Sequence, residues 1–443
     1  MADDLHKLSA VQAATAIRAG QLSSEALVSA CLAHIGEDPI KAWAFLDPDL
    51  ALVQAREMDR IRKVGHATGP LHGVPVALKD IIDTRFAPTE RGSAIFAERR
   101  PEADAPIVNR LREAGAVIMG KTKTTELAFV HPTDTLNPCD TTRSPGGSSS
   151  GSAAAVAAFH VPLAIGSQTG GSVIRPASYC GLYGLKPTRG VIPRNGVLET
   201  SETLDHLGTF ARTLDDVALL ADVIGHFDPR DPASFARPRP QMLPGARADV
   251  PVEPDIAWFD LPFNDRLDAD AREGLEAVIE ALGPRVERFP VSDTLAALID
   301  VHITIHEYEF CRHLAQVIDT HWDLLSDTLQ PIITRGRAIS ADQYEDAMAV
   351  RTSAEDFFAK HFLDFDAILA PSATGEAPLL ADGTGDPVFC RIASLAGLPS
   401  LTLPLLVGNN GLPIGVQLIG AIEEDDRLLR TANWVQTTLA TDA

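Results

Sequence analysis

The N-terminal part of the chain carries a helical pattern of apolar positions. Apolar residues recur at helical spacing over residues 8–17, and Gly20 can end this first helix. Ser23 or Ser24 can cap a second helix, because a serine side chain accepts hydrogen bonds from the free N–H groups of a first turn. We therefore expect residues 1–65 to form a helical region that packs on the core.

Short apolar runs then alternate with helical stretches. The runs Gly73–Lys79, Ala116–Met119 and Val161–Ile165 predict buried strands, and a helix closed by Gly115 is expected between the first two. Later strands are expected at residues 367–370 and 400–404. This alternation predicts an α/β fold, with a single domain built on a large mixed, mostly parallel central sheet covered by helices.

The segment 228–362 differs from its surroundings. It begins with a stretch rich in proline, arginine and alanine, typical of a surface excursion. New strands are expected to begin near Asp255 and Arg285, and the residues from 295 onward are mostly helical in pattern. We therefore expect the main domain, residues 66–443, to carry a helical insertion at about 228–362.

Composition narrows the possible partners. The chain has 443 residues, 45% of them apolar, and a net charge of −22. A surface this acidic repels phosphate backbones and anionic lipids, so neither nucleic acid nor membrane is expected as a partner. Five cysteines without a CxxC pair favour reduced thiols and a cytoplasmic protein. No signal peptide or run of 18 apolar residues is evident.

Two glycine- and serine-rich segments are candidates for chemistry. Gly146–Gly151 lacks the Gly-Lys-Ser/Thr ending of a phosphate-binding P-loop. Gly170–Ser172 follows, with its serine 24 residues beyond Ser148. Paired glycines allow a tight turn in which successive N–H groups point at one spot, the geometry of an oxyanion hole. Ile174 stands where a G-x-S-x-G elbow needs glycine, so no histidine-based triad is indicated.

Lys79 ends the first predicted strand of the main domain. A lysine buried there loses hydration, which lowers its pKa and allows it to act as a general base. Taken alone, Lys79 is better explained as a strand-end lysine whose amine reaches water.

Three segments considered together resemble the amidase signature family. They are Gly73-Val-Pro-Val-Ala-Leu-Lys79-Asp80, Pro145-Gly-Gly-Ser-Ser-Ser-Gly-Ser152 and Gln168-Thr-Gly-Gly-Ser-Val-Ile-Arg-Pro-Ala177. Further matches are Gly120-Lys-Thr, Asn137-Pro138, Cys180-Gly-Leu-Tyr-Gly-Leu-Lys-Pro187 and Gly411-Leu-Pro-Ile-Gly-Val-Gln-Leu-Ile-Gly420. The resemblance is densest over residues 70–215 and resumes at about 365–435.

This resemblance implies a Ser–cis-Ser–Lys triad. Ser172 corresponds to the nucleophile, Ser148 to a bridging serine and Lys79 to the base. The bridging serine would follow a cis peptide bond, here Gly147–Ser148. The backbone N–H groups across Thr169, Gly170, Gly171 and Ser172 would form the oxyanion hole.

The substrate-binding residues are less specified. Arg175 lies three residues beyond Ser172, a spacing that looks like malonamidase-type members, in which the arginine grips a substrate carboxylate. The alternative is that Arg175 pairs with an internal carboxylate and braces the loop. Gly147, Thr125 and His131 are further expected to contact the substrate.

The resemblance predicts a hydrolase of C–N bonds in linear, non-peptide amides, acting on a small amide that could bear a carboxylate. We expect a homodimer without metal or cofactor. His302 and His306 have a spacing that can bind zinc, but no third ligand is evident. Two alternatives stay open: an amidotransferase A-type subunit that releases ammonia for tRNA-linked transamidation, and a catalytically silent binding protein of the same fold.

Overall fold

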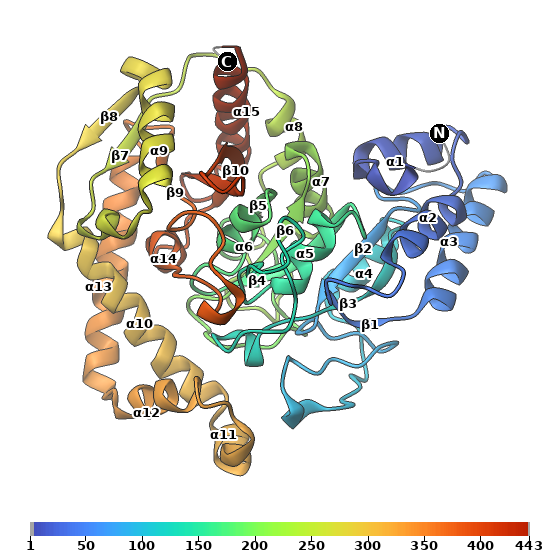
Figure 1. Ribbon diagram of the computed structural model, residues 1–443, viewed down its shortest axis with the longest axis horizontal. Helices are drawn as coiled ribbons and strands as arrows, with labels where there is room; N and C mark the ends of the chain where they lie inside the picture. Colours follow the sequence, from blue (N-terminus) through green and yellow to red (C-terminus); the bar gives the residue numbers. More distant parts are fainter. Residues whose placement is uncertain (1–3, 442–443) are drawn as a thin grey trace.

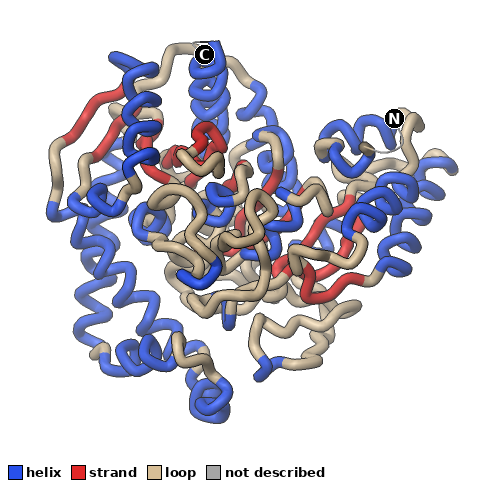
Figure 2. The backbone as a smooth tube through the Cα atoms, in the orientation of Figure 1, coloured by secondary structure: helices blue, strands red, loops and turns tan. Residues whose placement is uncertain are grey.

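The computed structural model describes residues 4–441, in which one sheet of eleven strands crosses the molecule and helices surround it (Figures 1 and 2). The strands are β1 (Trp43–Leu46), β2 (Pro75–Lys79), β3 (Val117–Thr122), β4 (Leu163–Gln168), β5 (Tyr183–Lys186), β6 (His206–Ala211), β7 (Ile256–Phe259), β8 (Val286–Phe289), β9 (Ala367–Pro371), β10 (Ser400–Val407) and β11 (Pro413–Ile419).

Fifteen α-helices are found in the same part of the chain. They are α1 (Ala10–Arg18), α2 (Ser24–Ile35), α3 (Pro48–Lys63), α4 (Pro106–Glu113), α5 (Ser150–Ala157), α6 (Ile174–Tyr179), α7 (Leu214–Ile224), α8 (Met242–Arg247), α9 (Ala269–Leu282), α10 (Asp293–His313), α11 (Ala315–His321), α12 (Gln330–Ala338), α13 (Ala341–His361), α14 (Val388–Leu395) and α15 (Asp425–Thr441). No helix in residues 4–441 is both long and apolar enough to cross a membrane.

The sheet has the strand order β1-β3-β2-β4-β6-β5-β10-β11-β9-β7-β8. The predicted α/β domain with a large mixed sheet is confirmed. The expected predominance of parallel pairing is not, because four of the ten neighbouring pairs between the described strands are parallel and six are antiparallel. Most of the antiparallel pairs involve strands β5, β6 and β11. The sequence does not predict them, and each pairs antiparallel with both of its neighbours.

The N-terminal region contains helices α1 to α3 and also strand β1, which the sequence does not predict. Ser9 and Gln12 form a capping box at the start of α1, and Ser23 caps α2 as expected. The Asp216 carboxylate of α7 accepts the N–H groups of Ala10 and Val11, which ties α1 to the main domain. β1 joins the edge of the sheet antiparallel to β3.

The segment 228–362 is not purely helical. It supplies β7 and β8, which begin near the predicted positions and extend the same sheet parallel to β9. Helices α10 to α13 then project from the sheet as an arm at the lower left of Figure 1. α10 packs against α12, α13 and α14. This packing brings residues of α10 and α12 to the cavity described below.

The pairing of β2 with β4 sets the position of the site. The two strands are parallel neighbours, and the carboxyl ends of parallel neighbours lie at the same edge of a sheet. Lys79 ends β2, and Gln168 ends β4. The chain therefore leaves β4 for the glycine pair beside the end of the strand that carries the lysine.

Candidate active site

Lys79 is fully buried and has no carboxylate partner among the described ion pairs. Its Nζ lies 2.7 Å from Ser148 Oγ and 2.8 Å from Ser167 Oγ. Burial holds the pKa of Lys79 well below its usual value, and the negative charge of Asp205 opposes this shift only in part. The amine does not reach water, so the strand-end alternative is wrong. A neutral amine in this position can accept a proton from a serine hydroxyl.

Ser148 follows a cis peptide bond, Gly147–Ser148, as the resemblance implies. Its loop is held by hydrogen bonds: Ser150 Oγ donates to the Gly146 carbonyl at 2.7 Å, and Thr125 N–H donates to the Ser148 carbonyl at 3.2 Å. The Ser148 side chain is buried and faces Lys79.

The loop that carries Ser172 turns back on Gln168. The Gln168 Oε1 atom accepts the N–H groups of Val173 and Ile174 at 2.9 and 3.0 Å. Among residues 4–441, no oxygen accepts a hydrogen bond from the N–H of Thr169, Gly170, Gly171 or Ser172. Four successive donors are therefore available beside the half-buried Ser172, as an oxyanion hole requires.

A cavity of about 300 Å³ opens at Ser172. Its wall combines the glycine loop with residues from α6, α10, α12 and the segment that leads into α14. The lining residues are Ala128, Phe129, Val130, Thr169, Gly170, Gly171, Ser172, Arg175, Ile303, His306, Glu307, Ile332, Arg335, Pro387 and Arg391. The lining includes three arginines and one carboxylate, that of Glu307. Burial lowers the pKa of His306 to about 3, so this histidine is neutral near pH 7. The cavity is cationic.

Arg175 is buried, and it lacks the carboxylate partner that its structural alternative requires. Its Nη2 donates to the Gly147 carbonyl at 2.6 Å and lies 3.5 Å from Thr384 Oγ1. Neither Nε nor Nη1 hydrogen-bonds with any described residue. Arg175 therefore braces the loop of Ser148 through a carbonyl group, and two of its donor nitrogens stay unpaired.

Three residues expected to bind substrate lie elsewhere. Thr125 Oγ1 donates to the Phe129 carbonyl, and a side chain on Gly147 would meet Thr384 Cγ2 at 2.8 Å. His131 lines a different cavity, and its Nδ1 hydrogen-bonds with Thr328 Oγ1. None of the three is among the residues that line the cavity at Ser172.

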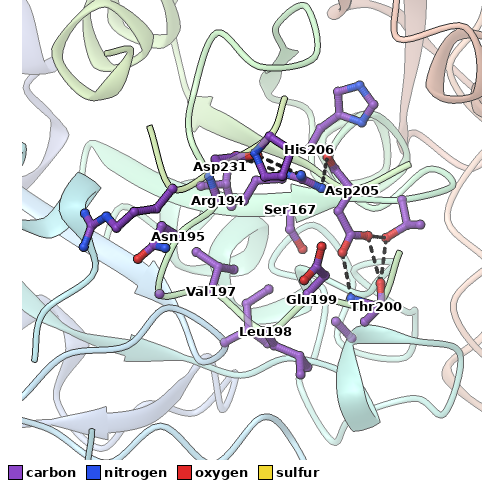
Figure 3. Close-up of a pocket in the computed structure, with 17 residues that line it drawn as sticks. Ser167, Arg194, Asn195, Val197, Leu198, Glu199, Thr200, Asp205, His206 and Asp231 are labelled. Atoms are coloured by element: carbon purple, nitrogen blue, oxygen red, sulfur yellow. Dashed lines mark hydrogen bonds and ion pairs between the residues drawn. The ribbon is translucent and has the colours of Figure 1, made fainter. Parts of the chain in front are cut away.

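Thr169 also lines a second cavity, of about 160 Å³, which Figure 3 shows. Ser167, whose Oγ contacts Lys79, lies on its wall. The Asp205 carboxylate also lines it and accepts hydrogen bonds from the side chains of Thr169 and Thr200, at 2.5 and 2.8 Å. Asp205 thus anchors the start of the glycine loop.

A family model described as Amidase matches residues 26–429. The chain belongs to this family. The A-type subunit of the glutamyl-tRNA(Gln) amidotransferase from Chloroflexus aggregans is 34% identical over 98% of this chain and 96% of its own length.

Solved structures of similar proteins cover the chain almost completely. One, described as revealing the evolutionary origins of an s-triazine catabolic enzyme, has a TM-score of 0.92 at 29% identity and covers 97% of this chain and 98% of its own. The 6-aminohexanoate cyclic dimer hydrolase has a TM-score of 0.85 at 26% identity, with 98% of each chain covered. These relatives confirm the family, but they do not support the closer resemblance to malonamidase-type members.

Several residues of this amidase family site are not predicted from the sequence. Ser167 could have been found, because it nearly ends a strand parallel to the one that carries Lys79. His302 is predicted only as a possible zinc ligand. Its Nε2 instead contacts the Thr169 carbonyl at 2.9 Å. Within the described chain, no three His, Cys, Asp or Glu residues are grouped as a metal site.

Proposed function

We propose that this protein hydrolyses a small, linear, carboxylate-bearing amide through an acyl-enzyme on Ser172. The observation that carries the hydrolase activity is the contact between a fully buried Lys79, without any carboxylate partner, and Ser148 at 2.7 Å. A lysine kept neutral by burial is a base that can draw a proton through a hydroxyl group.

The proposed reaction follows one proton path. Neutral Lys79 takes a proton from Ser148, which takes one from Ser172 as its oxygen attacks the amide carbonyl. Backbone N–H groups across Thr169, Gly170, Gly171 and Ser172 stabilise the oxyanion, and removal of one such donor lowers the rate about 10²–10³-fold. Ser148 returns a proton to the departing amine, and the C–N bond breaks. Water then attacks the ester by the same path and releases a carboxylic acid.

Arg175 supports the proposed carboxylate on the substrate. A buried guanidinium with unpaired Nε and Nη1 is costly unless an anion satisfies it. Arg335 and Arg391 line the same cavity, and its one carboxylate, Glu307, pairs with Arg335 at 2.6 Å. A planar guanidinium can hold a carboxylate with two parallel hydrogen bonds. The volume of the cavity, about 300 Å³, is at the lower end for ligand pockets and supports a small substrate.

Ammonia release from four amides tests the proposal: neutral propionamide and benzamide, and anionic malonamate and succinamate. We expect the purified chain to prefer the anionic amides, and Ser172→Ala to abolish release from all four. The proposal fails if Ser172→Ala retains wild-type activity. If the neutral amides are preferred, the hydrolase assignment stands and the carboxylate is wrong.

The second candidate is an amidotransferase A-type subunit, which the 34% identity to the Chloroflexus aggregans protein supports. In this case the isolated chain would hydrolyse none of the four amides and would need partner subunits. Light scattering on the purified chain would show whether it is the expected homodimer. A silent binding protein would leave Ser172 unlabelled by a fluorophosphonate, whereas in the proposed hydrolase the wild type is labelled and Ser172→Ala is not.

A further inference from the structure

Two carbonyl groups of the glycine loop are held from outside the loop. His302 Nε2 lies 2.9 Å from the Thr169 carbonyl oxygen, and Ser394 Oγ donates to the Gly170 carbonyl at 3.0 Å. His302 comes from α10, 133 residues away from Thr169 in the sequence. Both contacts act on carbonyl groups of the stretch that offers the free N–H donors.

The tautomer of His302 follows from its second contact. Arg391 Nη1 lies 2.9 Å from His302 Nδ1, and a guanidinium can only donate. Nδ1 is therefore the acceptor, and the proton of the neutral ring is on Nε2. Burial and the charge of Arg391 hold the pKa of His302 well below its usual value, so the ring stays neutral. His302 thus donates to the Thr169 carbonyl, in a chain from Arg391 through the imidazole to the peptide group.

This contact fixes the direction of an N–H group. In a trans peptide the C=O of one residue and the N–H of the next point in opposite directions. Holding the Thr169 carbonyl therefore holds the Gly170 N–H. The Asp205 carboxylate holds the Thr169 side chain but not this peptide group, and a Cβ built on Gly170 would meet no atom closer than His302 Cε1, at 3.7 Å. On Gly171, in contrast, it would meet Pro387 Cβ at 2.9 Å.

We infer that His302, oriented by Arg391, is a positioning residue that aims the Gly170 N–H at the oxyanion of acyl transfer. This inference rests on the proposed function. His302 and Arg391 come from helices α10 and α14, and this role places both at a glycine loop from the first half of the chain. His302 does not touch the substrate and acts only through the Thr169–Gly170 peptide group.

The test uses His302→Ala and His302→Gln in the full chain, with benzamide as substrate and benzaldehyde as an analogue that forms a tetrahedral adduct. We expect His302→Ala to lower kcat about 10- to 100-fold with little change in KM. This loss is smaller than the roughly 10²–10³-fold loss on removal of a whole oxyanion donor, because the Gly170 N–H remains but is no longer held in direction. The Ki for benzaldehyde should rise by the same factor, because the adduct places an oxyanion in the hole. The amide of His302→Gln can donate from the same place and should restore most of kcat.

Ile305→Val is the matched control, since Ile305 is buried on the same helix but does not line the cavity. It should lower Tm and leave kcat and the Ki for benzaldehyde unchanged. With neutral benzamide, Arg391→Met should lower kcat in the wild-type background and add little in His302→Ala, because Arg391 acts on the Gly170 N–H through the His302 ring.

Two results would overturn the inference while leaving the proposed function intact. One is full kcat in His302→Ala when Ser172→Ala is inactive. The other is a loss of kcat without a change in the Ki for benzaldehyde. If the wild type hydrolyses no amide, the proposed function fails instead. The rate at which a fluorophosphonate labels Ser172 then decides the role of His302, because the phosphoryl oxygen uses the same donors. Equal rates in wild type and His302→Ala would refute it.

Discussion

Replacing Lys79 with methionine is predicted to make the protein more stable at pH 7 and inactive. The unfolded chain carries a protonated lysine with a pKa near 10.5, whereas burial holds the pKa of the folded amine well below this value. The proposed base is neutral at pH 7, so folding at this pH must remove a proton. At about 1.4 kcal/mol per pH unit, this costs about 5 kcal/mol. Methionine has a similar length and no ionisable group, so its burial does not require the loss of a proton.

The loss of hydrogen bonds offsets part of this gain. Lys79→Met leaves Ser148 and Ser167 without their contacts to Nζ, and two such losses cost about 2–3 kcal/mol. The free energy of unfolding of the variant should therefore exceed that of the wild type by about 2 kcal/mol at pH 7. Because the pKa of Lys79 is lowered on folding, the wild type gains stability as pH rises toward 10.5. The advantage of the variant should fall by about 4 kcal/mol between pH 7 and pH 10.

Urea unfolding of both proteins at pH 7, 8, 9 and 10 measures this difference. Lys121→Met is the matched control, since Lys121 is also buried but lies 3.2 Å from Asp80 Oδ1, with a pKa lowered to about 8. Lys121 is mostly charged below that pH in the folded chain, so the stability difference between its variant and the wild type should change much less between pH 7 and 8 than that of Lys79→Met. A constant difference for Lys79→Met from pH 7 to 10 would show that Lys79 is charged when folded, and would refute the proposed base.

Three further predictions concern the site. The kcat/KM for benzamide should rise with pH as Lys79 loses its proton and then level off, since the base acts when neutral; a kcat/KM that falls as pH rises from 5 to 9 would contradict this. Arg175→Met should lower kcat/KM for succinamate at least about 10-fold more than for benzamide, since it removes a charged hydrogen-bond partner; equal losses would exclude a carboxylate anchor. Gly147→Ala should lower the free energy of unfolding by about 1–3 kcal/mol, because the added Cβ would lie 2.8 Å from Thr384 Cγ2. Adding Thr384→Ser to this variant should restore part of the lost free energy of unfolding, because it removes Cγ2. No recovery would show that the added Cβ clashes with a different group.

The parts of the fold that the sequence predicts are those with a local signal. Strands β2 and β4 are apolar runs, and α1 and α2 have serine caps that structure and sequence share. Strands β5 and β6 escape prediction because they are short and mixed in composition, with a glycine inside each. Their side chains are almost all buried, so the alternation that marks a half-exposed strand is absent.

The candidate site divides in the same way. Lys79, Ser148 and Ser172 lie in motifs whose spacing can be read along the chain. The partners that set their chemistry cannot be read in this way: Asp205 and His302 reach the glycine loop only through the fold, and His302 does so across 133 residues. A histidine on a helix has the same local pattern whether it binds a metal, packs in the core or donates to a distant carbonyl.

The unsatisfied polar groups of the site together describe its ligand. Within the described part of the chain, four N–H groups of the glycine loop lack acceptors, and on α6 the Nε and Nη1 atoms of Arg175 lack them too. Both sets lie on the wall of one cavity, while the net charge of the whole chain is −22. A buried donor without an acceptor costs about 1–3 kcal/mol, so a ligand that supplies the acceptors regains this energy on binding. A molecule with a carboxylate at one end and a carbonyl that becomes an oxyanion at the other would satisfy both sets, the second only as Ser172 attacks. Binding at Arg175 would then position the substrate, and the glycine loop would favour the transition state over the bound amide.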